Sequence, residues 1–153
     1  MSIVRIYTDG ACLGNPGPGG WAALIIANEG EQELSGGARH TTNNRMEMIA
    51  AIKGLRAVDS QSVVDLYTDS KYLCDGITSY IHNWRQSGWK TSSKNPVKNS
   101  DLWFKLDELS QSRFIHWHWV KAHSGHVENE RVDKLAREKA HTFHDQLENE
   151  NGQ

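Results

Sequence analysis

Two hydrophobic runs that lie far apart in the chain end in the same way, with Tyr-Thr-Asp followed by a small residue. The first run is residues 3–10 and the second is residues 63–70. Both are rich in β-branched and aromatic residues, which favour strands. An Asp that follows a strand is by itself more often part of a turn. Two strands with the same ending, however, predict that Asp9 and Asp69 lie together at one edge of a sheet, where open α/β folds place their sites.

The overall composition limits what these strands can belong to. The chain has 153 residues, 37% of them hydrophobic and 24% charged, which is typical of one soluble globular domain. No apolar stretch is long enough to span a membrane, and Arg5 interrupts the first apolar run before a signal peptide could develop. Cys12 and Cys74 form no CxxC pair and no metal-binding spacing, so we expect reduced thiols. We therefore expect a cytoplasmic monomer with no membrane partner.

The charge is unevenly distributed along the chain. Residues 81–100 carry +4 without any Asp or Glu, so the remainder must carry −6, because the net charge of the whole chain is −2. The cations are interleaved with aromatic residues, as on surfaces that bind a nucleic-acid backbone and stack against sugars or bases. The alternative is that some of the tryptophans belong to the core, and we expect this of at least one. The residues concerned are Tyr80, Trp84, Arg85, Trp89, Lys90, Lys94, Lys98 and Trp103.

The order of the elements indicates an α/β fold. The glycine-rich residues 14–20 do not suit a phosphate-binding loop, because they contain two prolines and lead into a strand-like run rather than a helix. They predict a hairpin connection within three antiparallel strands. A helix at about residues 43–58 then leads to the strand at 63–70, which the strand–helix–strand order makes parallel to its partner. Further expected elements are strands at 21–27 and 33–40, short helices to about residue 85, a helix at 101–109, a strand at 114–120 and a final helix.

Glu47 lies near the start of the predicted helix at 43–58. It shares a helix face with Ala50, Ala51 and Gly54, which are small enough to let the helix approach a sheet closely. This position predicts a glutamate that faces the sheet. The alternative is a solvated glutamate in the first turn, favoured by the helix dipole.

Four histidines could be read as zinc ligands. Strand alternation places His116 and His118 on one face, and His123 and His126 follow in the next loop. A solvated strand face explains the first pair better, because no cysteine lies near it. The carboxylates elsewhere favour a cation that prefers oxygen ligands, such as Mg²⁺.

Five short motifs follow one another between about residues 6 and 140. They are YTDG at 7–10 with GNPG at 14–17, TTNNRME at 41–47, TDS at 68–70, VKAH at 120–123 and ENERVD at 128–133. In this order and spacing they resemble bacterial type 1 ribonuclease H. The fold of that family is a mixed five-stranded sheet, three antiparallel strands followed by two parallel ones, with helices on both faces. The order of elements predicted above agrees with it.

The resemblance implies a metal-dependent endonuclease. It makes Asp9, Glu47, Asp69 and Asp133 the metal-binding acids and His123 a further catalytic residue. Two Mg²⁺ ions, with Mn²⁺ as an alternative, would activate a water molecule and stabilise the leaving 3′ oxygen during catalysis. The implied reaction cleaves the RNA strand of an RNA/DNA hybrid without sequence specificity and leaves 5′-phosphate and 3′-hydroxyl ends.

The resemblance also implies which residues hold the hybrid. Asn15 and Thr42 resemble contacts to DNA phosphates, and Trp103 resembles a contact to a DNA sugar. Asn15, Asn43 and Asn44, near the metals, can bind 2′-hydroxyls in the wide minor groove without reading the base sequence.

The segment at about residues 81–99 resembles the basic protrusion of the family, within a catalytic domain of residues 1–142. Two departures bear on the affinity for the hybrid. Gln86-Ser87 interrupts a basic run that many relatives keep unbroken, and Lys71 stands where glutamine is common. Residues 143–153 carry acids without periodicity, so we expect a disordered tail.

Two other classes of protein stay open. A related metal-dependent nuclease, such as a resolvase or a transposase core, would use similar acids but gives no reason for Asn43-Asn44 or for the protrusion. A noncatalytic hybrid-binding module would keep the protrusion but would not require all four acids.

Overall fold

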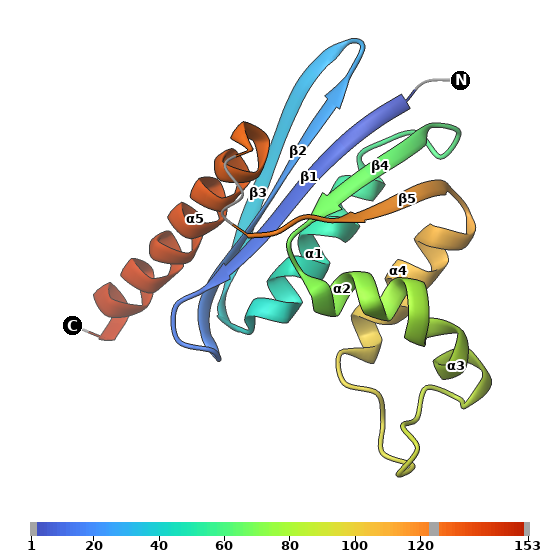
Figure 1. Cartoon of the computed structure of the whole chain (residues 1–153). Coiled ribbons are helices and arrows are strands. Elements are labelled where there is room, and N and C mark those ends of the chain that lie inside the picture. The colour runs from blue at the N-terminus through green and yellow to red at the C-terminus, as the bar shows by residue number, and fades with distance from the viewer. Residues whose placement is uncertain (1–2, 123–125, 152–153) are drawn as a thin grey trace.

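One mixed sheet organises the chain (Figure 1). The computed structural model describes residues 3–122 and 126–151, with side chains up to residue 146. The strand order in its five-stranded sheet is β3-β2-β1-β4-β5. Antiparallel pairs join β3, β2 and β1, and parallel pairs join β1, β4 and β5, so the predicted sheet is confirmed. The strands are β1 (Ile3–Cys12), β2 (Gly17–Ala27), β3 (Gly30–Thr41), β4 (Val63–Thr68) and β5 (Phe114–Trp119).

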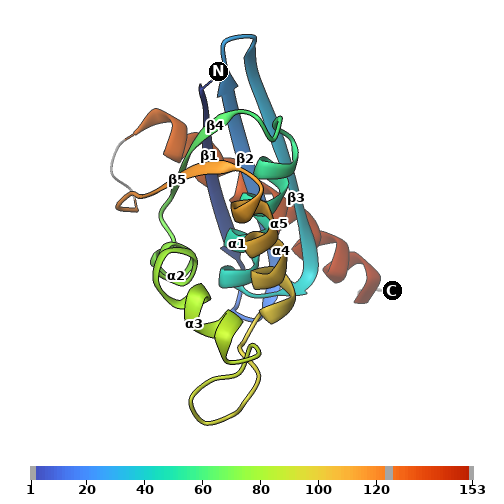
Figure 2. The same cartoon turned by 90° about the vertical axis from the view of Figure 1, so that its right-hand side faces the viewer.

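Helices cover both faces of this sheet (Figures 1 and 2). One face of β1 and β2 packs against α5 through Tyr7, Leu24, Val132 and Ala136. The other face packs against α1 and α4 and forms the larger core. The helices are α1 (Asn43–Arg56), α2 (Lys71–Asp75), the π-helical turn η1 (Gly76–Tyr80), α3 (Ile81–Gln86), α4 (Ser100–Gln111) and α5 (Val127–Asn151).

The parallel register between β1 and β4 fixes where the two similar strands end. Tyr7 pairs with Tyr67 and Ile6 with Leu66, so equivalent residues of the two repeats stand side by side. The Thr8 hydroxyl donates a hydrogen bond to the Tyr67 carbonyl oxygen at 3.2 Å and ties the strands together at this end. Asp9 and Asp69, two residues further along, therefore reach the same edge of the sheet.

The C-terminal segment differs from its prediction. Residues 143–153 were expected to form a disordered tail, but α5 continues to Asn151. The ring of Phe143 packs over Gly37, where an added Cβ would lie 2.8 Å from Phe143 Cδ2. This contact extends the buried face of α5 by another turn, and the Gln, Leu and Glu residues that follow are good helix formers.

None of the helices within residues 3–122 and 126–151 is both long enough and apolar enough to cross a lipid bilayer.

Candidate active site

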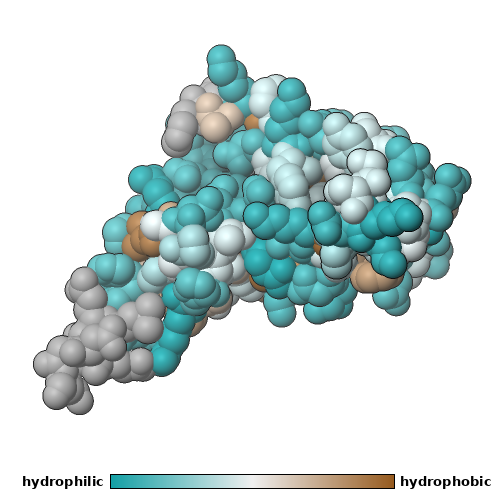
Figure 3. Space-filling view, turned by 90° about the horizontal axis from the view of Figure 1, so that it is seen from below, coloured by the Kyte–Doolittle hydropathy of each residue, from teal (hydrophilic) through white to brown (hydrophobic). Residues whose placement is uncertain are grey.

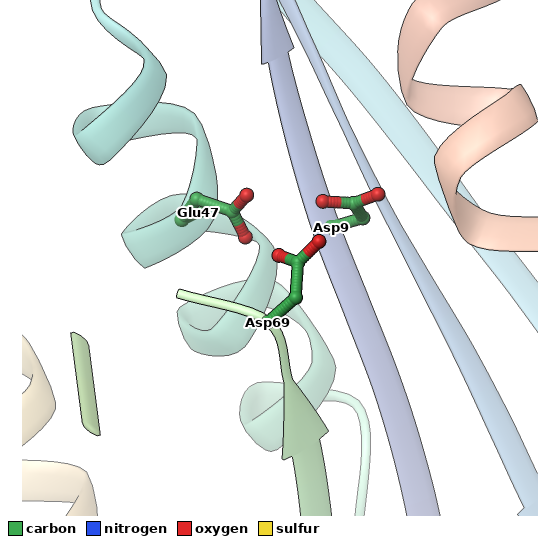
Figure 4. A group of neighbouring side chains, drawn as sticks. All are labelled: Asp9, Glu47 and Asp69. Carbon is green, nitrogen blue, oxygen red and sulfur yellow. The ribbon is translucent and has the colours of Figure 1, made fainter. Parts of the chain in front are cut away.

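Three carboxylates from three different elements converge at the edge of the sheet (Figure 4). Asp9 projects from β1, Glu47 from α1, and Asp69 from the residue that follows β4. One oxygen of each carboxylate lies within 4.8 Å of the others. Asp9 and Glu47 are only 5% and 3% exposed, whereas Asp69 is half-buried. Acids that are brought together and removed from water need a cation partner or shared protons.

The close approach of α1 to β1 is what places Glu47 beside Asp9. A Cβ added to Gly10 would lie 2.5 Å from the backbone nitrogen of Glu47, so only glycine leaves room for the helix here. The helix begins where Thr42 Oγ1 accepts a hydrogen bond from the Arg45 backbone N–H at 3.2 Å. Glu47 therefore faces the sheet as predicted, and the alternative of a solvated glutamate is wrong.

The electrostatics of the three acids favour uptake of positive charge. Burial raises the pKa of Asp9 to about 8, with a further contribution from the charge of Asp69. Burial, followed by the charges of Asp9 and Asp69, raises the pKa of Glu47 well above its ordinary value. Burial also raises the pKa of Asp69, although hydrogen bonds with Glu47 and Asp9 oppose that rise. Glu47 Oε2 is buried and has no hydrogen-bond partner, so this oxygen is free to bind a cation.

Asp133 lies at the side of this group. It lines a small cleft together with Asp9 and Asp69, but it does not belong to the set of oxygens within 4.8 Å of one another. Its Oδ2 instead forms an ion pair with Arg137 Nη2 at 2.9 Å, one turn further along α5. The predicted fourth acid thus borders the site without joining the other three. His123, the fifth predicted catalytic residue, lies outside the described residues.

Known proteins show which family the chain belongs to. The RNase H family model matches residues 1–141. The chain belongs to the ribonuclease H family. Ribonuclease H of Rhodopseudomonas palustris strain BisB5 is 59% identical over 90% of this chain and 92% of its own, and that of Rhizobium meliloti strain 1021 is 54% identical over 94% of each. The resemblance to bacterial type 1 ribonuclease H is therefore confirmed.

Solved structures show the same fold. LC9-RNase H1, described as a type 1 RNase H with the type 2 active-site motif, has a TM-score of 0.83 and 32% identity, and the match covers 94% of this chain and 74% of that one. LC11-RNase H1 in complex with an RNA/DNA hybrid has a TM-score of 0.67 and 24% identity, and the match covers 91% of this chain and 97% of that one. The second likeness, at its lower identity, supports the fold alone.

The asparagines predicted to bind substrate lie beside the acids of this ribonuclease H family member. Asn43, Asn44 and Lys71 line the same cleft as Asp9 and Glu47. Asn15 is on the loop between β1 and β2, where its Oδ1 accepts a hydrogen bond from the Asn43 backbone N–H at 3.0 Å. The loop and the start of α1 are thereby held together, next to the Thr42 cap. The binding of a hybrid by these residues stays a prediction.

The sequence did not single out two neighbours of this cleft, Arg45 and Asn99. Arg45 donates to Asn99 Oδ1 at 3.1 Å and forms a two-pronged pair with Asp101. Asn99 has a left-handed backbone with φ of 60° and donates to the Tyr72 hydroxyl at 3.1 Å. This network joins α1, α2 and α4 beside the acids. Asn99, two residues before Asp101, was the available signal, because Asn adopts left-handed conformations readily.

The segment at residues 81–99 forms a projecting helix and loop between η1 and α4. The end of the molecule that carries it is largely hydrophilic (Figure 3). Lys90, Lys94 and Lys98 are all exposed, as expected of a surface that binds a polyanion. The protrusion is braced against α4, because Arg85 pairs with Asp107 at 3.1 Å.

The aromatic residues of this region divide into exposed and buried groups. Tyr80 is 53% exposed and stacks on the half-buried Trp84, with ring centroids 6.0 Å apart. Trp89 is half-buried and packs on Phe104 with centroids 4.2 Å apart. Trp103 is fully buried, and its indole N–H donates to the Tyr72 hydroxyl at 3.3 Å. The prediction that Trp103 contacts a DNA sugar is therefore wrong, since this ring belongs to the core beneath the protrusion.

The strand histidines do not form a metal site. His118 Nε2 lies 2.8 Å from Asp65 Oδ1, and its ring stacks on Tyr67 with centroids 4.7 Å apart. His116 is exposed. Within residues 3–122 and 126–146, the only grouping suited to a metal ion is that of Asp9, Glu47 and Asp69.

Proposed function

We propose that this enzyme hydrolyses the RNA strand of RNA/DNA hybrids at a site that holds two Mg²⁺ ions, leaving 5′-phosphate and 3′-hydroxyl ends. The convergence of Asp9, Glu47 and Asp69, with one buried Glu47 oxygen left without a partner, is the observation that carries the proposal. Carboxylate oxygens are the ligands that Mg²⁺ prefers, and Mn²⁺ would fit the same set. The bound ions would activate the attacking water and stabilise the leaving 3′ oxygen.

The acids would divide the work according to their positions. Asp9 lines the cleft together with Asp69 and Asp133 and would be the ligand shared by both ions. Glu47 and Asp69 would fix the ion nearer the leaving group, while Asp133, which borders the cleft with Asp9 and Asp69, would help to hold the ion that activates water. His123 would handle a proton or assist product release, a role that rests on the family resemblance.

The residues around the acids would select the substrate. Asn15, Asn43 and Asn44 would bind 2′-hydroxyls, which distinguish RNA from DNA in the minor groove. Lys71 lines the same cleft and would bind a phosphate or the minor groove. Thr42, near the Asn15–Asn43 hydrogen bond, and Asn15 would hold a DNA phosphate.

The protrusion would bind a part of the hybrid that lies at a distance from the acids. Lys90, Lys94 and Lys98 would contact phosphates, and Tyr80, Trp84 and Trp89 would present rings to sugars. None of these contacts reads the edge of a base, so cleavage would not depend on sequence.

We further propose that the enzyme acts as a cytoplasmic monomer and that residues 1–142 suffice as its catalytic domain.

A cleavage assay tests this proposal directly. A uniform hybrid labelled on either strand is incubated with the protein in Mg²⁺ or in EDTA, alongside duplex DNA and duplex RNA of the same sequence. We expect cleavage of the RNA strand alone, at many positions, in Mg²⁺ only. Cleavage of duplex DNA would favour a resolvase-like or transposase-like nuclease, and binding without cleavage would favour a noncatalytic module.

A further inference from the structure

The fourth acid of the site is paired with a cation of its own helix. Asp133 and Arg137 stand four residues apart on α5, with Asp133 Oδ2 and Arg137 Nη2 2.9 Å apart. The Asp133 side chain is 26% exposed and that of Arg137 is 60% exposed. The carboxylate that borders Asp9 and Asp69 is therefore already partly neutralised by a group outside the cleft.

The neighbouring cations of α5 are arranged differently. Arg131 forms ion pairs with Glu31 and Glu33 of β3, at 2.7 and 2.6 Å. Lys134 is adjacent to Asp133 in sequence and is exposed, and it lies with Arg137 on the outer side of the helix. Of these three cations, Arg137 is the one that forms an ion pair with the Asp133 carboxylate.

A guanidinium and a metal ion are alternative partners for the same carboxylate. Arg stays protonated throughout the working pH range, so the pair does not dissolve by proton loss. A cation that binds Asp133 Oδ2 competes with Arg137 for this oxygen, and displacement of the guanidinium costs the free energy of the ion pair. Within the described residues, the ion pairs that Lys and Arg side chains form on the acids of this site are confined to Asp133, and the three central acids gain positive charge from protons or metal.

We propose that Arg137 competes with the metal ion for Asp133 and thereby sets the metal concentration at which this fourth acid joins the site. Arg137 is a positioning residue in this proposal, since it acts through Asp133. The inference rests on the proposed metal-dependent function. The expected effect is modest, because exposed ion pairs are weak. Removal of the guanidinium should lower the Kd of the ion that Asp133 helps to bind by about two- to five-fold.

Metal binding without substrate provides the test. Free Mn²⁺ is counted by electron paramagnetic resonance during titration of the full chain, for the parent, Arg137→Gln, Asp133→Asn and the double variant. We expect Arg137→Gln to tighten the Mn²⁺ binding that Asp133→Asn weakens, and to have no effect once Asp133 is replaced. Thermal unfolding in EDTA verifies that each variant is folded.

Lys134→Gln is the matched control, because it removes the same charge next to Asp133 without removing the ion pair. The proposal would be overturned if Lys134→Gln gave an equal gain in Mn²⁺ affinity, or if the gain in Arg137→Gln persisted with Asp133→Asn. Either result would show that the loss of a positive charge acts through the overall electrostatic field and not through the ion pair. Unchanged binding in Arg137→Gln would overturn it as well. A parent that shows this linkage but does not cut hybrids would refute the proposed function alone, whereas a hybrid-cutting parent without the linkage would refute the inference alone.

Discussion

Tyr7 and Tyr67 stack face to face, with ring centroids 4.7 Å apart and only 11° between their planes. Each ring stands two residues before a carboxylate of the site, Asp9 after Tyr7 and Asp69 after Tyr67. The stack lies across a parallel pair of strands, so it can form only in the register that brings these two acids together. Packing of the strands and assembly of the site are therefore consequences of the same alignment.

Replacement of Asp9 should separate activity from stability. Asp9→Asn should abolish cleavage, because it removes the shared ligand, yet it should raise the melting temperature in EDTA at pH 8 by a few degrees. The side chain keeps its size while the repulsion from Asp69 and Glu47 disappears. Calorimetry in EDTA and in Mg²⁺ measures both effects, and Mg²⁺ should stabilise the parent more than the variant. A variant that melts lower in EDTA would mean that bonds such as the 2.8 Å hydrogen bond from the Gly10 N–H to Asp9 Oδ1 dominate instead.

The stability of the metal-free protein should fall as the pH rises. The pKa of Asp9 is about 8 in the folded protein, and those of Glu47 and Asp69 are also raised, chiefly by burial. The unfolded chain releases these protons near pH 4, so the folded state binds more protons between about pH 4 and pH 8. Stability present at low pH is lost across this window. Melting temperatures in a metal chelator from pH 5 to pH 9 measure the loss, and the Asp9→Asn curve should be flatter.

Neutralisation of the protrusion should affect binding rather than chemistry. The triple replacement of Lys90, Lys94 and Lys98 by Gln should weaken hybrid binding and reduce its salt dependence by up to about 0.9 log units for each phosphate that is no longer bound. The kcat at saturation should change little, because these exposed side chains do not belong to the acid cluster. Replacement of the exposed Lys53 and Lys105 on α1 and α4 is the control. A fall in kcat with an unchanged salt slope would place these lysines at the chemistry.

Two aromatic residues of the same region should respond in opposite ways. Trp103→Ala should lower the free energy of unfolding by about 3–5 kcal/mol, because it empties a fully buried site. Tyr80→Ala should cost little stability, since that ring is 53% exposed, but should weaken hybrid binding. Chemical denaturation and a binding titration on both variants measure the two effects. Equal decreases in stability would mean that Tyr80 is also structural.

The sequence carried enough information for the strands and the three central acids. Asp9 and Asp69 could be placed because the repeated strand ending implies a shared edge, and Glu47 because small residues mark the helix face that meets the sheet. Trp103 was assigned to a DNA-sugar contact because it resembles that contact of the family and follows a segment in which aromatic residues and cations are interleaved. Its spacing from Leu102 and Leu106, both buried, was the contrary signal, since adjacent and i+3 positions can share a broad buried face.

Other features depend on packing that sequence pattern alone does not reveal. The helical end of α5 depends on the packing of Phe143 over Gly37, which are more than a hundred positions apart. The Asp133–Arg137 pair follows from side-chain rotamers rather than from spacing, because the same i,i+4 spacing is also compatible with two solvated groups.

The fixed position of the protrusion has a consequence for the length of the hybrid that the enzyme would bind best. Arg85 pairs with Asp107 and Trp89 packs on Phe104, so the protrusion that bears the lysines is fixed to α4. On the proposed function, a hybrid long enough to reach both the loop and the acids would bind more tightly than a shorter one that reaches the acids alone. The proposed contacts would therefore make binding depend on the length of the hybrid and not on its base sequence.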